Sequence, residues 1–325
     1  MQAILIKSSG EAEQMYFGEI DRPSPGPNEV LVRIAYTALN RADILQRMGQ
    51  YPVPPGDSPV MGLEMSGEIV MAGSEVRKWH PGDQVFGLLN GGGYAEYAII
   101  HEDMAMPIPA GLGLKEAAAI PEVFLTAYQA LHWIGKMKAG DQVLIHAGAS
   151  GVGTAALQLA QLAGATSLVT ASAGKHDICR SLGAARTIDY RNEDFAEAVL
   201  EFTGSRGVDI ILDFIAANYF QQNLRSLAVD GRIIMLALMG GIKVPDVNLA
   251  PILMKRLQIT GSTLRNRSLE YKIRLTQDLF TYTREHFASG QLRPIIDTVF
   301  PWREVADAHR YMEANRNQGK ILLML

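Results

Sequence analysis

A glycine-rich turn between a strand pattern and a helix pattern, within residues 140–164, constrains the fold of this chain more than any other feature. The alternating apolar run over 143–147 predicts a buried strand, and residues 154–160 show the apolar spacing of a helix. The turn between them reads Gly148-Ala149-Ser150-Gly151-Val152-Gly153. Glycines let the backbone approach a dinucleotide pyrophosphate, and the N-terminus of the following helix favours its negative charge. The segment therefore predicts a dinucleotide-binding α/β fold.

The spacing of these glycines differs from the usual one. The turn has the form G-x-x-G-x-G, whereas the common dinucleotide fingerprint is G-x-G-x-x-G. A single match of either kind is a weak signal, and the alternative is a tight turn that binds nothing. We favour a binding site because a strand precedes the turn and a helix follows it.

Length and composition indicate a globular protein of two domains. The 325 residues suffice for two units of about 150 residues each. A formal net charge of −4 argues against nucleic acid or an anionic membrane as the main partner. The single cysteine, Cys179, excludes a disulfide within the chain and a cysteine-based zinc cluster. No stretch has the pattern of a signal peptide or a membrane span, so we expect a cytoplasmic protein.

Two secondary-structure patterns divide the chain. The first third alternates short strand patterns with Pro and Gly, and the prolines of residues 51–59 predict a stiff loop. From about residue 123, strands alternate with helices, which predicts a parallel sheet. The predicted strands are 142–147, 167–171, 186–189, 208–213 and 232–238, and the predicted helices are 152–163, 175–182, 194–203 and 218–228. A helix over Leu269–Ser289 and a last strand over Lys320–Leu325 follow.

The end of the strand over 167–171 bears on the type of dinucleotide. NAD-specific sites place an acidic residue there, which binds the ribose 2′-hydroxyl. This chain has Ser172-Ala173-Gly174-Lys175 instead, with no acid. Ser172, Lys175 and the following helix N-terminus would accommodate a 2′-phosphate, so we expect NADPH. The alternative is that Lys175 is an ordinary solvated lysine.

Motifs spread over the whole chain together resemble one family. They are Ala38–Asp43, Gly49–Tyr51, Gly62–Gly67, Trp79–Asp83, Gly91–Tyr97, Ala119–Pro121, Leu125–Ala127 and the glycine turn. Their order resembles the medium-chain dehydrogenase/reductase superfamily, and within it the zinc-independent NADPH:quinone oxidoreductases of the zeta-crystallin-like branch. The chain is most similar to the tumour-suppressor-inducible quinone oxidoreductases of that branch.

The resemblance implies a doubly wound parallel Rossmann sheet inserted into a mostly-β, GroES-like catalytic domain. Residues 1–122 and 267–325 would form the catalytic domain, and residues 123–266 would form the NADPH-binding domain. The active site would lie in the cleft between the two domains. A homodimer would form through the sheet edge near residues 232–262.

The resemblance also implies that no metal takes part. Zinc-dependent relatives carry Gly-His-Glu where this chain has Gly62-Leu63-Glu64, and a cysteine ligand roughly at the position of Asn40. Leucine cannot bind a metal, and a catalytic zinc needs three protein ligands. The expected reaction is therefore metal-free hydride or one-electron transfer from NADPH to a quinone.

By resemblance, Asn40 and Tyr51 are the catalytic residues, near the nicotinamide and the quinone oxygens. Arg265 would stand near the C-terminal cofactor contact of Asn317 and Lys320. The alternatives are that Tyr51 only packs the proline loop, and that Asn40 and Asp43 cap a helix beginning near Ala42. Thr126 would contact the nicotinamide side, or else cap a helix. The implied cofactor-binding residues are Thr126, Ser150, Gly151, Val152, Gly153, Ser172, Lys175, Tyr190, Phe214, Leu238, Asn317 and Lys320.

Two other functions fit the same sequence. An NADPH-dependent 2-enoyl or alkenal reductase would use the same fold and would benefit from a proton donor near the α-carbon, for which Tyr51 could serve. Relatives of the branch also act as lens crystallins or bind AU-rich RNA. The slight acidity of the chain argues against RNA binding as the main role, because a basic surface is missing.

Overall fold

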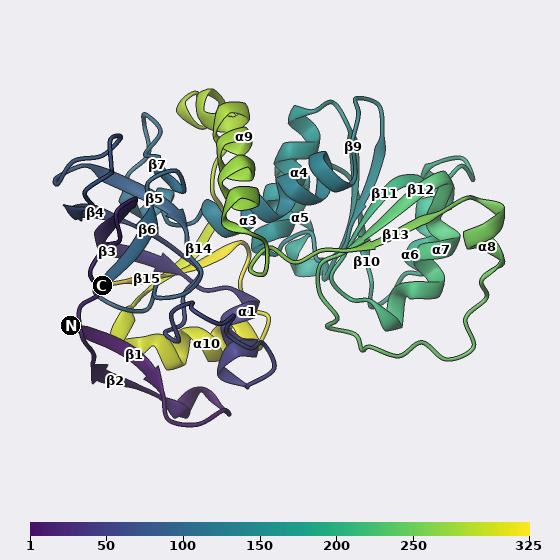
Figure 1. The fold of residues 1–325 in the computed structure, drawn as a ribbon. Helices are drawn as coiled ribbons and strands as arrows, with labels where there is room; N and C mark the ends of the chain where they lie inside the picture. The colour runs from purple at the N-terminus through teal and green to yellow at the C-terminus, as the bar shows by residue number, and fades with distance from the viewer. The chain divides into compact units, whose positions relative to one another are not determined.

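The computed structural model describes residues 1–325, and the chain divides into two compact units (Figure 1). Unit 1 comprises Met1–Leu125 and Arg265–Leu325, and unit 2 comprises Thr126–Leu264. Unit 2 is therefore inserted in the sequence of unit 1. None of the helices has both the length and the apolar character that a membrane-spanning helix needs.

Unit 1 is mostly β-structure. Its strands are β1 Gln2–Ile6, β2 Met15–Glu19, β3 Glu29–Ala38, β4 Glu64–Ala72, β5 Gln84–Leu88, β6 Tyr97–His101, β7 Ala105–Pro107, β14 Ile296–Pro301 and β15 Lys320–Met324. A seven-stranded sheet has the order β14-β15-β3-β4-β5-β7, with β6 paired to β3, while β1 and β2 pair separately. Only β14 and β15 run parallel.

The C-terminal strand completes the N-terminal sheet of unit 1. β15 pairs antiparallel with β3, so that Leu322 lies opposite Ala38. One core cluster joins Ile4 of β1 and Ile321 of β15 to the helices beside them. The longer helices that include residues of unit 1 are α1 Arg41–Arg47, α3 Pro121–Tyr128, α9 Leu269–Ala288 and α10 Val305–Glu313, beside the short α2 Leu114–Ala117.

Unit 2 contains a six-stranded parallel sheet. Its strands are β8 Gln142–Ile145, β9 Thr166–Ala171, β10 Ala184–Asp189, β11 Val208–Asp213, β12 Leu227–Met235 and β13 Gln258–Gly261. Its helices are α4 Gly151–Leu162, α5 His176–Ser181, α6 Phe195–Phe202, α7 Phe220–Ser226 and α8 Ala250–Met254. The strand order is β10-β9-β8-β11-β12-β13, and every pair is parallel.

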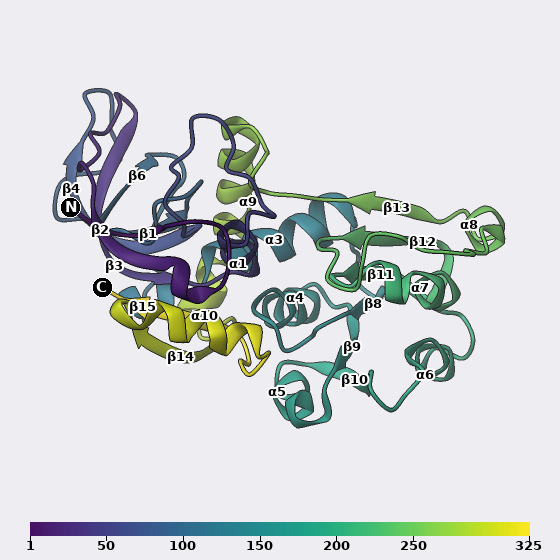
Figure 2. The same cartoon turned by 90° about the horizontal axis from the view of Figure 1, so that it is seen from below.

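The helices of unit 2 cover both faces of its sheet. Figures 1 and 2 show α4 and α5 on one side of the strands and α6 and α7 on the other. Leu144 and Ile211 of the sheet pack against Phe195 of α6 and Leu224 of α7 in one core cluster. The predicted fold class, a doubly wound parallel sheet inserted in a mostly-β domain, is confirmed. The strand order reverses between β8 and β11, which is where open α/β sheets bind ligands.

Several predicted element bounds are wrong. β8 ends at Ile145 rather than at residue 147, because Ala147 turns the chain with a φ of 51°. The helix predicted over 218–228 ends at Ser226, and β12 begins at Leu227 instead of residue 232. Leu227 is fully buried and pairs with Val208, so sheet packing overrides the helical pattern there. The elements α8, β13, β14 and α10 were not predicted.

Candidate functional site

The glycine turn lies at the carboxyl end of the sheet in unit 2, between β8 and α4. Ser150 caps α4, because its Oγ accepts a hydrogen bond from the N–H of Gly153 at 3.0 Å. A Cβ on Gly153 would lie 2.4 Å from the carbonyl oxygen of Ala147, so only glycine fits there. The N–H groups of Gly151 and Val152 belong to the first turn and have no partner within the helix. The turn therefore fits an anionic pyrophosphate.

Ser172, Lys175 and Tyr190 lie at the carboxyl ends of the neighbouring strands β9 and β10. Ser172 directly follows β9, and Lys175 ends the 3-10 helix after it. Tyr190 directly follows β10 and is 42% exposed. Ala171 lies opposite Asp189 in the parallel pair, so the two strand ends are adjacent. The structure brings these three predicted 2′-phosphate residues to one edge of the sheet.

Sequence reasoning missed Arg191 at this edge. Its side chain is exposed, and its guanidinium carbon lies 5.8 Å from the ring centroid of Tyr190. The carboxylate of Asp189 is buried and accepts hydrogen bonds from the Arg191 N–H and from Asn192 Nδ2. Asp189 thus stabilises its own turn. A basic residue one position after a strand-end tyrosine was the signal available in the sequence.

The other predicted cofactor residues of unit 2 lie at different places. Phe214 directly follows β11 and is 9% exposed, and Leu238 lies in the loop after β12 and is 53% exposed. The carbonyl oxygen of Phe214 accepts a hydrogen bond from the N–H of Met239 at 3.1 Å, which joins the two loops. Thr126 is the sixth residue of α3, so the alternative that it caps a helix N-terminus is wrong.

A buried polar network surrounds Glu64 in unit 1. Lys320 Nζ donates to Glu64 Oε1 at 2.7 Å, to Asn40 Oδ1 at 2.7 Å and to the Leu39 carbonyl oxygen at 2.8 Å. Asn40 Nδ2 donates to Glu64 Oε1 at 2.8 Å, and the Glu122 N–H donates to Glu64 Oε2 at 2.9 Å. The three donors of Lys320 and the amide of Asn40 are therefore used within unit 1. Their contacts to cofactor or acceptor stay predictions, and each contact would require the exchange of one of these bonds.

Asn317, the other predicted cofactor contact of unit 1, precedes β15. Its Nδ2 donates to the carbonyl oxygen of Gly319 at 2.7 Å. This bond holds the turn that leads into β15, where Lys320 begins the strand. The cofactor contact of Asn317 also stays a prediction.

The network around Glu64 does not fit a zinc ion. Leu63 offers no donor atom, and the Glu64 carboxylate already binds the Lys320 ammonium. A metal ion at Glu64 would meet the positive charge of Lys320. The chain has no group of three or more His, Cys, Asp or Glu side chains arranged to hold a metal. Catalytic zinc requires three such protein ligands, so this site lacks the ligands that a zinc-dependent reaction needs.

Asn40 is the N-cap residue of α1, and Asp43, the third residue of the helix, completes a capping box with it. Its Oδ2 accepts the N–H of Asn40 at 2.8 Å, and its Oδ1 accepts the N–H of Gly62 at 3.1 Å. The side chain is fully buried, and this burial raises the pKa of Asp43 to about 6 although both backbone bonds oppose the shift. Asp43 therefore ties α1 to the Gly62-Leu63-Glu64 segment.

Tyr51 and Arg265 lie together in unit 1. The guanidinium carbon of Arg265 is 5.4 Å from the ring centroid of Tyr51. Arg265 donates to Gln46 Oε1 at 2.7 Å and to the Asn90 carbonyl oxygen at 3.0 Å, and its buried Nε has no partner. Burial raises the pKa of Tyr51, with the charge of Arg265 opposing, so the hydroxyl is protonated at neutral pH. A protonated phenol beside a cation can stabilise negative charge that develops on a carbonyl oxygen.

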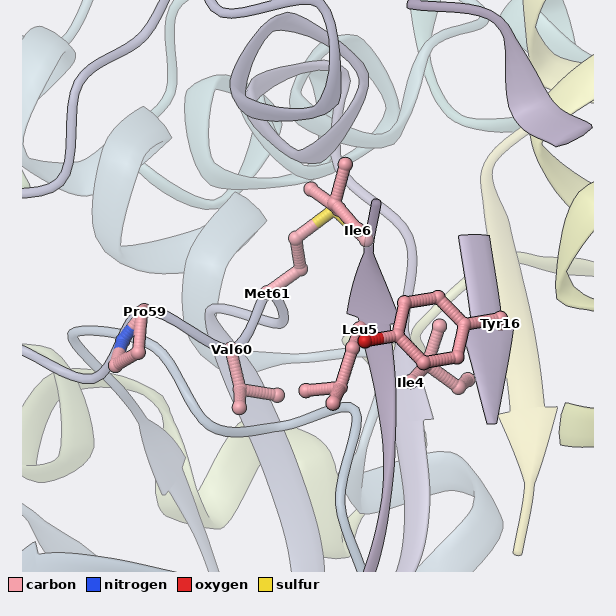
Figure 3. A pocket seen from close by; sticks show the side chains of 7 residues that line it. All are labelled: Ile4, Leu5, Ile6, Tyr16, Pro59, Val60 and Met61. Atoms are coloured by element: carbon pink, nitrogen blue, oxygen red, sulfur yellow. The ribbon is translucent and has the colours of Figure 1, made fainter. Parts of the chain in front are cut away.

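A separate cavity of about 220 Å³ lies in unit 1 (Figure 3). It is lined by Ile4, Leu5 and Ile6 of β1, Tyr16 of β2 and residues 59–61. Figure 3 shows the side chains of Leu5 and Val60 pointing toward one another. The lining is apolar apart from the Tyr16 phenol, and it contains none of the predicted site residues.

Two families match parts of the chain. An alcohol dehydrogenase GroES-like domain matches residues 26–110, and a zinc-binding dehydrogenase family matches residues 182–323. The rat (Rattus norvegicus) synaptic vesicle membrane protein VAT-1 homolog is 30% identical over 316 residues, which are 93% of this chain and 78% of that protein. A mycocerosic acid synthase-like polyketide synthase of Mycobacterium tuberculosis is 31% identical over 98% of this chain. The chain spans only 15% of the length of that synthase.

Solved structures of oxidoreductases match the whole chain. The quinone oxidoreductase of Escherichia coli complexed with NADPH has a TM-score of 0.90 and 28% identity, with 100% of both chains covered. The CurK enoyl reductase has a TM-score of 0.89 and 29% identity, covering 99% of this chain and 98% of that one. An NAD-dependent alcohol dehydrogenase has a TM-score of 0.89 and 30% identity, with 100% of both chains covered.

Proposed function

Because the chain belongs to the medium-chain dehydrogenase/reductase superfamily of oxidoreductases, we propose that it is an NADPH:quinone oxidoreductase that uses no metal. The observation that carries the proposal is the pair of Tyr51 and Arg265. A quinone accepts electrons without an acid catalyst, and the charge that develops on its oxygen needs hydrogen-bond donors and nearby positive charge. Tyr51 and Arg265 have this chemistry.

Most of the predicted residues have a role in this proposal. When bound, NADPH supplies the hydride. The turn at Ser150, Gly151, Val152 and Gly153 binds the pyrophosphate, and Ser172, Lys175, Tyr190 and Arg191 bind the 2′-phosphate. Phe214 and Leu238 provide apolar contacts along the strand ends. Tyr51 donates its hydroxyl hydrogen to the acceptor oxygen while Arg265 holds its ring, and the Glu64–Lys320 network orients Asn40.

A substrate panel tests the proposal. NADPH oxidation is followed with 1,4-benzoquinone, 9,10-phenanthrenequinone, 2-hexenal and crotonyl thioesters at matched concentrations. We expect kcat/KM for the quinones to exceed that for the enals and thioesters by at least about tenfold. Enals or thioesters that exceed the quinones by the same margin would overturn the quinone proposal, and the absence of turnover with every acceptor would overturn both enzymatic functions.

A 2-enoyl or alkenal reductase is the second candidate, and one observation favours it. The phenol of Tyr51, whose pKa burial raises further from neutrality, is protonated at neutral pH, as a proton donor to an α-carbon must be. The likeness to an enoyl reductase structure and to a polyketide synthase is in keeping with this chemistry. Product analysis in deuterated water separates the two reactions, because only enoyl reduction leaves a solvent deuteron on carbon.

We also propose that a second copy of the chain covers the free edge of the sheet in unit 2. β13 is the edge strand, and its four residues are all exposed. Ile259 of β13 is an exposed apolar residue, and the segment between β12 and β13 carries further exposed apolar side chains at Leu238, Met239, Ile242, Val244, Leu249, Leu253 and Met254. An unpaired edge next to apolar side chains pairs readily with another strand, and a two-fold axis would place β13 against its own copy.

A further inference from the structure

Four buried polar side chains form a continuous chain across the point in unit 2 where the strand order reverses. His146 Nε2 lies 2.8 Å from Asn223 Oδ1, and Asn223 Nδ2 donates to Asp213 Oδ2 at 3.1 Å. On the other side of the ring, His146 Nδ1 lies 3.0 Å from Thr170 Oγ1. None of the four residues is more than 1% exposed. The chain of hydrogen bonds therefore belongs to the interior of unit 2.

The bonding pattern assigns the proton on His146. The Asn223 amide nitrogen faces Asp213, so its Oδ1 faces His146 and can only accept. Nε2 of His146 therefore carries the hydrogen, and Nδ1 accepts from the Thr170 hydroxyl. Burial lowers the pKa of His146, which agrees with a neutral ring.

This network connects the ends of three adjacent strands. His146 directly follows β8, Thr170 lies in β9, and Asp213 ends β11. The carbonyl oxygen of Thr170 also accepts the N–H of Gly148 at 3.0 Å, which ties the glycine turn to β9. Asn223 of α7 bridges β8 and β11 from one face of the sheet.

Two strained turns lie next to the network. Ala147 has a φ of 51°, and Ala216 has a φ of 66° with a ψ of −114°. The Oδ1 atom of Asp213 holds the second turn by accepting the N–H groups of Ile215 at 2.8 Å and of Ala216 at 3.0 Å. Residues other than glycine adopt such backbone angles only where their surroundings enforce them. Both turns follow the strands that flank the reversal point, which is the binding position for dinucleotides in this class of sheet.

We propose that His146, Asn223, Asp213 and Thr170 are positioning residues that hold the Ala147 and Ala216 turns in the shape that the bound dinucleotide requires. The inference rests on the proposed binding of NADPH and names residues with no assigned part in it. These side chains are too deeply buried to reach the cofactor. They preorganise the turns, so their loss weakens cofactor binding and leaves turnover at saturation nearly unchanged.

The test compares Thr170→Val with Thr170→Ser. Valine keeps the shape and strand preference of threonine but removes the hydroxyl, whereas serine retains it. Asn223→Leu removes both hydrogen bonds at the centre of the network, to His146 and to Asp213, so we expect it to have the larger effect. Ser226→Ala is the matched control. Ser226 is the last residue of α7, and its buried hydroxyl donates to the backbone carbonyl oxygen of Gln222 rather than to the His146 network. Dissociation constants for NADPH are measured by fluorescence, together with the melting temperature of each apoprotein.

We expect Thr170→Val to raise the dissociation constant about three- to tenfold and Asn223→Leu to raise it more, with kcat at saturating NADPH within about twofold of the parent. Thr170→Ser and Ser226→Ala should bind like the parent. A lower melting temperature with an unchanged dissociation constant in Thr170→Val would overturn the inference, because the network would then serve stability alone. A parent protein that binds neither NADPH nor NADH would instead overturn the proposed function.

Discussion

The Nζ atom of Lys320 lies 2.7 Å from Oε1 of Glu64, and both side chains are almost completely buried. The pair joins the first residue of β15 to the first residue of β4, and Asn40 contributes two further hydrogen bonds. A buried ion pair of this kind adds little net stability, but removal of one partner leaves a charge without compensation. Glu64 and Lys320 therefore depend on each other.

Lys320→Met should reduce the free energy of unfolding by about 3–5 kcal/mol, because the Glu64 carboxylate would lose its counter-charge. Urea denaturation measures this loss. The double variant Glu64→Gln with Lys320→Met should recover part of it, and Arg256→Met, which breaks an exposed pair with Asp230, should have no measurable effect. If Lys320→Met keeps its stability but weakens NADPH binding, Lys320 contacts the cofactor and the structural role assigned to it is wrong.

Lys175→Glu should shrink the preference for NADPH over NADH by at least about tenfold, because a carboxylate repels a 2′-phosphate. Fluorescence titration with both cofactors measures the ratio of the two dissociation constants. Lys138→Glu is the matched control, since Lys138 is exposed and precedes β8 at the opposite end of the strands. Equal affinity of the parent for NADPH and NADH would refute the 2′-phosphate site.

Tyr51→Phe should lower kcat for quinones by about tenfold or more with little change in KM, because the phenol hydrogen stabilises charge that develops only during transfer. Steady-state kinetics and the melting temperature are measured together. If the melting temperature falls while kcat does not, Tyr51 only packs the proline loop. Tyr16→Phe, at an exposed tyrosine of β2, is the control for loss of a phenol.

His309 should make the protein less stable in mild acid. Its Nε2 lies 3.1 Å from the Tyr94 hydroxyl and its Nδ1 lies 3.3 Å from Arg47. Burial, together with the charge of Arg47, lowers the pKa of His309 to about 3. The unfolded chain therefore binds a proton below about pH 6.5 that the folded chain does not bind until about pH 3. The free energy of unfolding should fall across this window as the pH falls, by up to about 1.4 kcal/mol per pH unit.

His309→Gln tests this acid dependence, because glutamine keeps polar partners for Tyr94 and Arg47 but does not titrate. Urea denaturation between pH 7.5 and 4.5 should give a shallower slope than in the parent. Part of the pH dependence that remains in His309→Gln comes from His146, whose pKa is also lowered by burial. His80→Gln, at an exposed position, is the control for the loss of a histidine. Identical slopes in His309→Gln and the parent would contradict a neutral buried His309.

Ile259→Lys should convert a dimer to a monomer, because it places a charge on the free edge strand β13. Light scattering after size-exclusion chromatography measures the mass. Leu269→Lys changes an exposed apolar residue in unit 1 and should leave the mass unchanged. A parent protein that is monomeric at micromolar concentration would rule out the proposed interface.

The predictions from sequence succeeded where the signal was local. The strand, turn and helix around Gly148–Gly153 lie within one short segment, and β11 was predicted with its observed bounds at 208–213. The predictions failed where pairing within the sheet overrides the local pattern. Leu227 lies in a helical pattern, but it pairs with Val208 and belongs to a strand. β13 was missed because it is short and exposed, without the alternation of a half-buried strand.

The sequence by itself determined the dinucleotide turn and the doubly wound class, because backbone preferences and apolar periodicity act over a few neighbouring residues. The tertiary structure alone decided the partners of buried polar groups. Lys320 meets Glu64 across 256 positions, and His146 meets Asn223 across 77. Such partners follow from strand order and register. A single sequence does not show the strand order or the register. A buried charge or polar group nevertheless needs its partner, because an unpaired one would destabilise the fold.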